Sequence, residues 1–275
     1  MTNGRAALCV GINEFKNFSG NNLRGCVNDA NDMAFALKEL LGFEDDDITI
    51  LTDSKATKAA IISNLGKMIK DAKAGKLSCI VFSMSSHGTQ VPDVGGDEPD
   101  RYDEAFCPHD LTSRGNNWDP AHIIVDDELR DLFAQLPDGV RLEVWLDTCH
   151  SGTGLKAIDL LPDRKPRYIP PPTLEAFRAV EDRRPRGLAR GLLEKGITDQ
   201  ILWAACRADQ TSADANIDGG WHGAFTFYFC RELRASKNNL TRAKLLARVR
   251  GGLSGDYNQI PQLECDDINR KQKLG

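Results

Sequence analysis

The sequence predicts an α/β protein in which a mostly parallel, six-stranded sheet lies between two layers of helices. Short apolar runs alternate along the chain with segments whose apolar residues recur at helical spacing. This order is typical of parallel strands joined by crossover helices. The length of 275 residues suits one large domain, and no apolar run is long enough to span a membrane.

The individual elements follow from these patterns. Strands are predicted in six apolar runs, at residues 6–12, 48–51, 77–84, 140–146, 200–206 and 262–265. Helices are predicted at 28–41, 57–75, 126–136, 224–236 and 241–253, the first with Asn28 or Asp29 as its N-cap. A short hairpin should join 104–108 to 123–125. Two stretches show no periodic spacing of apolar residues, the acidic segment 89–119 and the segment 155–198. Five prolines oppose regular structure in the first half of the second segment.

Composition narrows the classes of function. The formal net charge of −5 argues against nucleic acid as the main partner. The eight cysteines show no CxxC or other metal-type spacing, so several should be small buried apolar residues. The first residues lack the pattern of a secretory signal peptide. Together these features predict a soluble, reduced, cytoplasmic protein.

Two predicted strands end in residues that could act as a nucleophile and its base. The strand at 140–146 leads to Cys149, and the strand at 77–84 leads to His87. The carboxyl ends of parallel strands meet at one edge of a sheet, where ligand sites form. A thiol and an imidazole side by side there would suit nucleophilic catalysis. His150 is a competing base, but neighbours on an extended strand point to opposite faces, which favours His87.

Other residues near these strand ends could complete a site. The N–H groups of Gly88 and Cys149 are candidate donors to the oxyanion of a tetrahedral intermediate. Asp147 should share the face of Cys149, and Asp29 follows the first loop. Two carboxylates in a cleft would select an Arg or Lys side chain and reject Asp or Glu. The alternative is that Asp29 is a helix cap, Asp147 a turn residue, and the cysteine and histidine merely structural.

At these motifs the chain resembles the caspase-like cysteine peptidases, and within them the metacaspases and their bacterial relatives, the orthocaspases. The matching motifs span nearly the whole chain, at residues 11–13, 23–30, 86–90, 96–104, 124–128, 147–152, 205–213, 223–226 and 261–263. The resemblance implies one caspase-like peptidase domain over 1–275. It would comprise a large-subunit part (1–154), a linker (155–199) and a small-subunit part (200–275).

The resemblance also implies roles for individual residues. Cys149 would be the nucleophile and His87 the base of a Cys–His dyad. Asp29 and Asp147 would form the acidic substrate pocket, with Ser85 helping to line it. Cleavage of protein and peptide substrates would then follow Arg or Lys rather than Asp. The chemistry itself would require no cofactor.

Many metacaspases need calcium as an activator. Asp126 and Asp127 match the central pair of their acidic cluster, and carboxylate oxygens suit Ca²⁺. The group places a further Asp soon after the nucleophile, where this chain has Lys156. Calcium dependence therefore stays open beside the alternative that the two aspartates only complement a helix N-terminus.

Such enzymes often cut themselves in the linker, which here offers basic side chains. The candidates for self-cleavage are Arg183, Arg184, Arg186 and Arg190. A solvated basic loop is the alternative interpretation. Acidic residues around the last strand should discourage edge-to-edge pairing, which predicts a monomer.

Two other classes of function compete with the peptidase. A catalytically silent caspase-like scaffold would bind a partner, but the intact dyad and both pocket aspartates argue against it. A nucleotide-binding α/β domain would need a GxGxxG or GxxxxGK[ST] loop after the first strand, and the sequence has neither.

Overall fold

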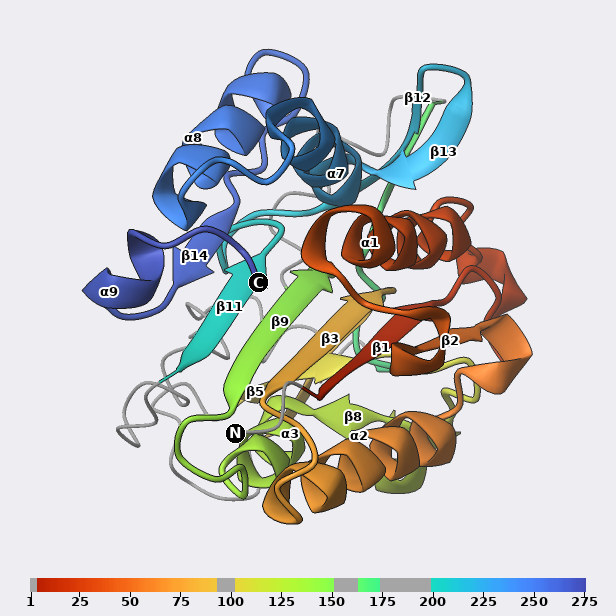
Figure 1. Ribbon diagram of the computed structural model, residues 1–275. Helices are drawn as coiled ribbons and strands as arrows, with labels where there is room; N and C mark the ends of the chain where they lie inside the picture. Colours follow the sequence, from red (N-terminus) through yellow and green to blue (C-terminus); the bar gives the residue numbers. More distant parts are fainter. Residues whose placement is uncertain (1–3, 93–101, 151–162, 174–198) are drawn as a thin grey trace.

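The computed structural model describes residues 4–92, 102–150, 163–173 and 199–275. A six-stranded sheet lies at its centre, in the order β14-β11-β9-β3-β1-β2 (Figure 1). The strands are β1 (Arg5–Gly11), β2 (Ile48–Thr52), β3 (Cys79–Ser85), β9 (Arg141–Asp147), β11 (Gln200–Ala204) and β14 (Gln262–Glu264). All neighbours pair in parallel except β14, which runs antiparallel to β11 at the edge. The predicted sheet is therefore confirmed.

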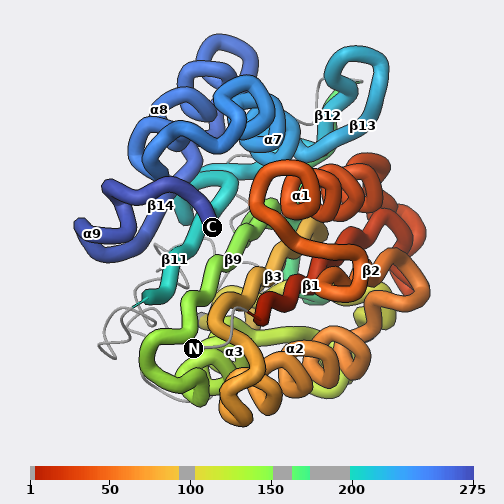
Figure 2. Tube along the Cα trace, in the orientation of Figure 1, coloured from red at the N-terminus to blue at the C-terminus, as the bar shows by residue number. Residues whose placement is uncertain are grey.

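Helices cover both faces of this sheet, as Figures 1 and 2 show. One layer holds α1 (Cys26–Leu41), α7 (Ala224–Ser236) and α8 (Arg242–Leu253); the other holds α2 (Lys58–Lys73) and α3 (Asp126–Phe133). The short α9 (Asp267–Arg270) follows β14. Single turns of 3₁₀ helix lie at Ser19–Asn21, Asp45–Asp47, Asp53–Lys55 and Pro120–His122. No helix in the described ranges combines the length and apolarity needed to cross a membrane.

The alternation of side chains along the strands explains the three layers. Leu8 and Val10 of β1 pack into the cluster beneath α2 and α3, whereas Ala7 and Cys9 pack into the cluster beneath α1 and α7. Successive residues of a strand point to opposite faces, so a strand that is apolar at every position buries both faces. The short apolar runs of the sequence meet this requirement.

Helix α1 begins earlier than the sequence predicted. Its first residue is Cys26, and neither Asn28 nor Asp29 caps it. The side-chain oxygen of Asn13 instead accepts from the backbone N–H of Cys26 at 2.8 Å. Because a distant side chain satisfies this helix end, Asp29 lies within the first turn and its buried carboxylate is available for other contacts.

Two small three-stranded sheets flank the carboxyl edge of the central sheet. The first contains β4 (Gly88–Pro92), β5 (Tyr102–Phe106) and β8 (Ile124–Val125). Its antiparallel β5–β8 pairing confirms the predicted hairpin, and β4 is an addition. The second contains β10 (Arg164–Pro166), β12 (Ala213–Ile217) and β13 (Gly220–Gly223). A further ribbon joins β6 (Ser113–Arg114) to β7 (Asn117–Trp118).

The expectation of irregular structure after residue 155 was wrong at β10. This strand lies at the edge of its sheet, where proline is tolerated because one side of the strand needs no ladder hydrogen bonds. The β12–β13 hairpin turns at Asp218 and Gly219, both with positive φ (53° and 86°). An Asp-Gly pair favours this turn, so the sequence did carry a signal for it.

Candidate active site

The parallel register of β3 and β9 brings the ends of these two strands to the same level. Ser85 pairs with Asp147, and two residues beyond each of them lie His87 and Cys149. Both of these side chains are buried. A Cβ on Gly88 would overlap the carbonyl oxygen of Cys149, so the two chain segments approach closely and only glycine fits at position 88.

The hydrogen bonding of His87 determines which ring nitrogen can accept a proton. Its Nε2 lies 2.6 Å from the carbonyl oxygen of Asn21, and a carbonyl only accepts, so Nε2 carries the hydrogen. Nδ1 then holds the lone pair, and this buried atom has no hydrogen-bond partner in the described part of the chain. Burial lowers the pKa of His87 to about 4. The imidazole is therefore neutral, and a base, at neutral pH.

The thiol of Cys149 lies beside a second buried cysteine. Cys149 Sγ donates to the carbonyl oxygen of Gln210 at 2.8 Å, and Cys206 Sγ donates to the same oxygen at 3.4 Å. A hydrogen bond from Cys149 and burial together raise the pKa of Cys206. Cys206 therefore stays protonated at neutral pH, and with Cys149 and Tyr168 it forms a small buried cluster.

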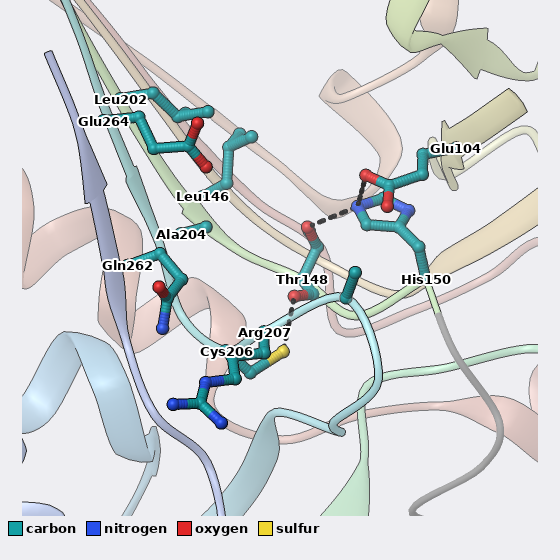
Figure 3. Close-up of a pocket in the computed structure, with 11 residues that line it drawn as sticks. Glu104, Leu146, Thr148, His150, Leu202, Ala204, Cys206, Arg207, Gln262 and Glu264 are labelled. Carbon is teal, nitrogen blue, oxygen red and sulfur yellow. Dashed lines mark hydrogen bonds and ion pairs between the residues drawn. The ribbon is translucent and has the colours of Figure 1, made fainter. Parts of the chain in front are cut away.

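His150 points into a different part of the molecule. Its Nδ1 lies 3.1 Å from the carbonyl oxygen of Ala105, and its Nε2 lies 3.2 Å from Oγ1 of Thr148. His150 and Glu104 line a cavity of about 260 Å³. Figure 3 shows the two side chains next to each other. Since both ring nitrogens have partners, His150 is less suited than His87 to accept a proton from a thiol.

The two predicted pocket aspartates do come together, around a residue that the sequence analysis did not single out. The guanidinium of Arg167 contacts three buried carboxylates: Asp29 at 2.6 Å, Asp147 at 3.2 Å and Asp214 at 3.0 Å. Arg167 and all three aspartates are almost completely buried. Ser85 is buried as well and, being in register with Asp147, lies on the same face of the sheet.

Neutral donors hold each carboxylate of this cluster in place. Asp29 accepts from Gly223 N (2.9 Å), and Asp214 accepts from Gly25 N (3.0 Å). Asp147 accepts from Ser212 Oγ at 2.6 Å and from Thr226 Oγ1 at 2.7 Å. The fold therefore holds the three carboxylates in place without help from the cation. The cluster is a preformed site for one positive charge.

Burial and charge oppose each other in this cluster. Burial raises the pKa of Asp29 to about 7, although the nearby guanidinium acts in the other direction. Burial alone would lower the pKa of Arg167, but Asp147, Asp29 and Asp214 outweigh it and raise that pKa. We therefore take the arginine as charged. A neutral side chain here would leave several buried carboxylates unbalanced.

The backbone of Arg167 is hydrogen bonded as well. Gly88 N–H, a predicted oxyanion donor, donates to the carbonyl oxygen of Arg167 at 3.0 Å. Arg167 N–H donates to Ser212 O, and Ile169 N–H donates to Gly88 O, both at 3.0 Å. Arg167, Ser212 and Asp214 were missed because their placement depends on pairing between β10 and β12, which lie about fifty residues apart in the chain.

The two predicted calcium ligands do not form a cage of carboxylates. Asp126 Oδ1 accepts from the backbone N–H of Asp127 at 3.0 Å, and the carboxylate of Asp127 pairs with Arg130. The described residues contain no group of three or more His, Cys, Asp or Glu side chains able to hold a metal. As they stand these aspartates do not fit a calcium site, and calcium activation stays an untested prediction.

The predicted self-cleavage residues in the linker lie outside the described residues. They are Arg183, Arg184, Arg186 and Arg190. Lys156, which stands where the resembled group has an aspartate, is also outside them. These predictions rest on the sequence alone.

Comparisons with known proteins agree with this fold. The family model for the caspase domain matches residues 4–272. Metacaspase-1A of Aspergillus niger is 33% identical over 296 residues, covering 96% of this chain and 70% of the relative. Metacaspase-1 of Coccidioides immitis is also 33% identical, covering 96% and 62%. The chain thus spans roughly two thirds of the length of these relatives.

Two solved structures are also similar to this chain. A protein from Geobacter sulfurreducens is 26% identical with a TM-score of 0.67, covering 98% of this chain and 97% of that one. Caspase-1 of Spodoptera frugiperda shares the fold, with a TM-score of 0.60 at 14% identity, covering 96% and 88%. The chain belongs to the caspase-domain family of cysteine peptidases, among relatives of the metacaspases.

Proposed function

We propose that this protein is a cysteine endopeptidase that cleaves proteins after Arg or Lys by means of a Cys149–His87 dyad. One observation carries the proposal: three fixed, buried carboxylates surround a guanidinium directly beside the strand end that bears the thiol. A pocket with this charge favours a basic side chain and rejects an acidic one by several kcal/mol.

The dyad would work by general base catalysis. His87 is neutral at rest, so its Nδ1 takes the proton of Cys149 as the sulfur attacks the substrate carbonyl carbon. Asn21 O accepts from Nε2–H, which fixes the tautomer and stabilises the imidazolium that forms. Gly88 N–H donates to the developing oxyanion. His87 then protonates the leaving amine, and water hydrolyses the thioester.

Several finer expectations belong to the same proposal. The chain would act as a cytoplasmic monomer on protein substrates, without a partner nucleic acid, and would process itself within the linker. No cofactor takes part in the steps above. Calcium, if it activates the enzyme, would have to engage ligands other than the carboxylate of Asp127, which pairs with Arg130.

The test is a peptidase assay with fluorogenic peptides that differ only in the residue before the cleaved bond. Arg and Lys peptides should be hydrolysed and the Asp peptide should not. Cys149→Ala should abolish hydrolysis while leaving the circular dichroism spectrum unchanged. Parallel assays with calcium and with a chelator measure the role of the ion. Hydrolysis of the Asp peptide in preference to the Arg peptide would refute the pocket assignment.

A further inference from the structure

We propose that residues 163–169 of the chain itself occupy the substrate cleft as a bound substrate, and that the enzyme cuts its own Arg167–Tyr168 bond. This inference rests on the function proposed above and gives its self-processing a specific site. It places that site upstream of the arginine cluster at 183–190 that the sequence suggested.

The side chain of Arg167 is the first support. It fills the acidic pocket that the proposed function assigns to the substrate, with its guanidinium on Asp29, Asp147 and Asp214. Its Nη1 also donates to the backbone carbonyl of Asp147, at 3.0 Å. A basic side chain, the type that the enzyme is proposed to prefer, therefore already lies in the pocket. The pocket residue Asp147 precedes the proposed nucleophile, Cys149, by two residues.

The backbone leading to Arg167 is bound as an added strand. β10 pairs antiparallel with β12, with Arg164 opposite Ala215 and Pro166 opposite Ala213. The N–H of Arg167 continues this ladder to Ser212 O at 3.0 Å. Extended peptides often bind proteins by adding a strand to an exposed sheet edge, with pockets that receive particular side chains. β12 provides the edge here, and the acidic cluster provides the pocket.

The carbonyl group of Arg167 is the third support. Its oxygen accepts from Gly88 N–H, the donor that the mechanism assigns to the oxyanion. The next residue, Tyr168, packs against Cys149 in a buried cluster. The Arg167–Tyr168 bond therefore lies between the acidic pocket, which holds Arg167, and the buried cluster of Cys149 and Cys206, which holds Tyr168.

A purely structural arginine would explain only part of this arrangement. Neutralising the aspartates requires the guanidinium alone, since a buried ion cluster needs balanced charge. It does not require that the same residue's N–H extend the β12 ladder, nor that its carbonyl accept from Gly88. A cleavable substrate must satisfy all three conditions at once, because the carbonyl has to be polarised while the side chain is held.

The reaction balances with one water molecule. Cys149 sulfur attacks the carbonyl carbon of Arg167, and its proton passes through His87 to the nitrogen of Tyr168. The peptide bond breaks, which leaves a thioester at Arg167 and a free amine at Tyr168. Water then hydrolyses the thioester, regenerates the thiol and produces a carboxylate at Arg167. The products are fragments 1–167 and 168–275.

The experiment follows the intact chain by mass spectrometry during incubation. A fragment that begins at Tyr168 should appear, and Cys149→Ala should prevent it. Arg167→Lys should keep the cut, because it keeps the charge, whereas Arg167→Gln should remove it. The matched control replaces Arg183, Arg184, Arg186 and Arg190 with Gln and should leave the cut at Tyr168 intact. The rate should not change on tenfold dilution, since enzyme and substrate are one chain.

The outcomes separate this inference from the proposed function. If the chain hydrolyses Arg peptides but is cut only at 183–190, or not at all, the inference is overturned and the proposed function stands. If it hydrolyses neither Arg peptides nor itself, both fail. Arg167→Gln could unfold by leaving the carboxylates without a cation. The wild-type fragments and the charge-preserving Arg167→Lys then decide the matter.

Discussion

Replacing Asp29 with Asn should reduce the preference for Arg peptides by about 10- to 150-fold. Asp29 makes the shortest contact to the guanidinium, 2.6 Å, and both groups are buried. Asn keeps the shape, and its oxygen can still accept from Gly223 N, but its amide nitrogen donates and carries no charge. Hydrogen bonds to charged groups contribute about 1.5–3 kcal/mol, and each 1.4 kcal/mol is roughly tenfold in rate.

The assay measures kcat/KM for two peptides that differ only in Arg or Gln before the cleaved bond. The ratio of the two values is the quantity of interest, because competition by the chain's own Arg167 affects both peptides equally and cancels. This ratio should fall in Asp29→Asn, with kcat/KM for the Gln peptide nearly unchanged.

The matched control is Asp32→Asn, one turn along the same helix. Asp32 pairs with His222 and Arg234, each at 3.2 Å, and does not contact Arg167. Its ratio should stay within about twofold of wild type, since surface pairs contribute little. An equal loss on both peptides in Asp29→Asn, or the same change in Asp32→Asn, would refute the charge-selective pocket.

Three further predictions concern the base His87, Gly88 with Gly66 as its control, and the buried Arg242. Burial lowers the pKa of His87 to about 4, so its imidazole should stay an active base until the pH falls through about 4. The profile of kcat/KM is measured with the Gln peptide, because protonation of Asp29, whose pKa is about 7, would weaken only the binding of Arg; an acidic limb near 6.5 with the Gln peptide would contradict the prediction. Gly88→Ala should abolish peptidase activity, because its Cβ would overlap the carbonyl of Cys149. Gly66 lies within α2, and a Cβ there would meet open space. Gly66→Ala should therefore raise the free energy of unfolding by about 0.5–1 kcal/mol in denaturant titrations. Arg242→Ala should cost about 3–5 kcal/mol of unfolding free energy, since it leaves a buried glutamate without its partner; a loss below 1 kcal/mol in the same titrations would argue against that pairing.

The low pKa of His87 also has a consequence for stability. The folded state binds fewer protons than the unfolded state between about pH 4 and 6.5, so this group destabilises the fold as the pH falls through that window. Circular dichroism at each pH is therefore needed beside the rate profile, to separate protonation of the base from unfolding.

Local patterns predicted the frame of this protein well. The six strands and the helical layers could be predicted from the sequence because each apolar run or helical period is decided within about fifteen residues. The positions of Cys149 and His87 at neighbouring strand ends follow from the same reasoning, since parallel strands bring their carboxyl ends together. The start of α1 was misplaced because its cap comes from Asn13, outside the helix's own segment.

Only the tertiary structure decided what fills the acidic pocket. Sequence patterns gave Asp29 and Asp147 a plausible role, but neither Asp214 nor Arg167 stands out locally, and prolines around 166 argued against a strand there. The pairing of β10 with β12 joins residues about fifty positions apart, and such contacts depend on the whole fold rather than on local propensity. The sequence thus determined that a thiol, an imidazole and the carboxylate of Asp147 lie at the ends of two sheet strands, and that the carboxylate of Asp29 lies near the start of a helix. Long-range strand pairing decided that a guanidinium of the same chain lies between the two carboxylates.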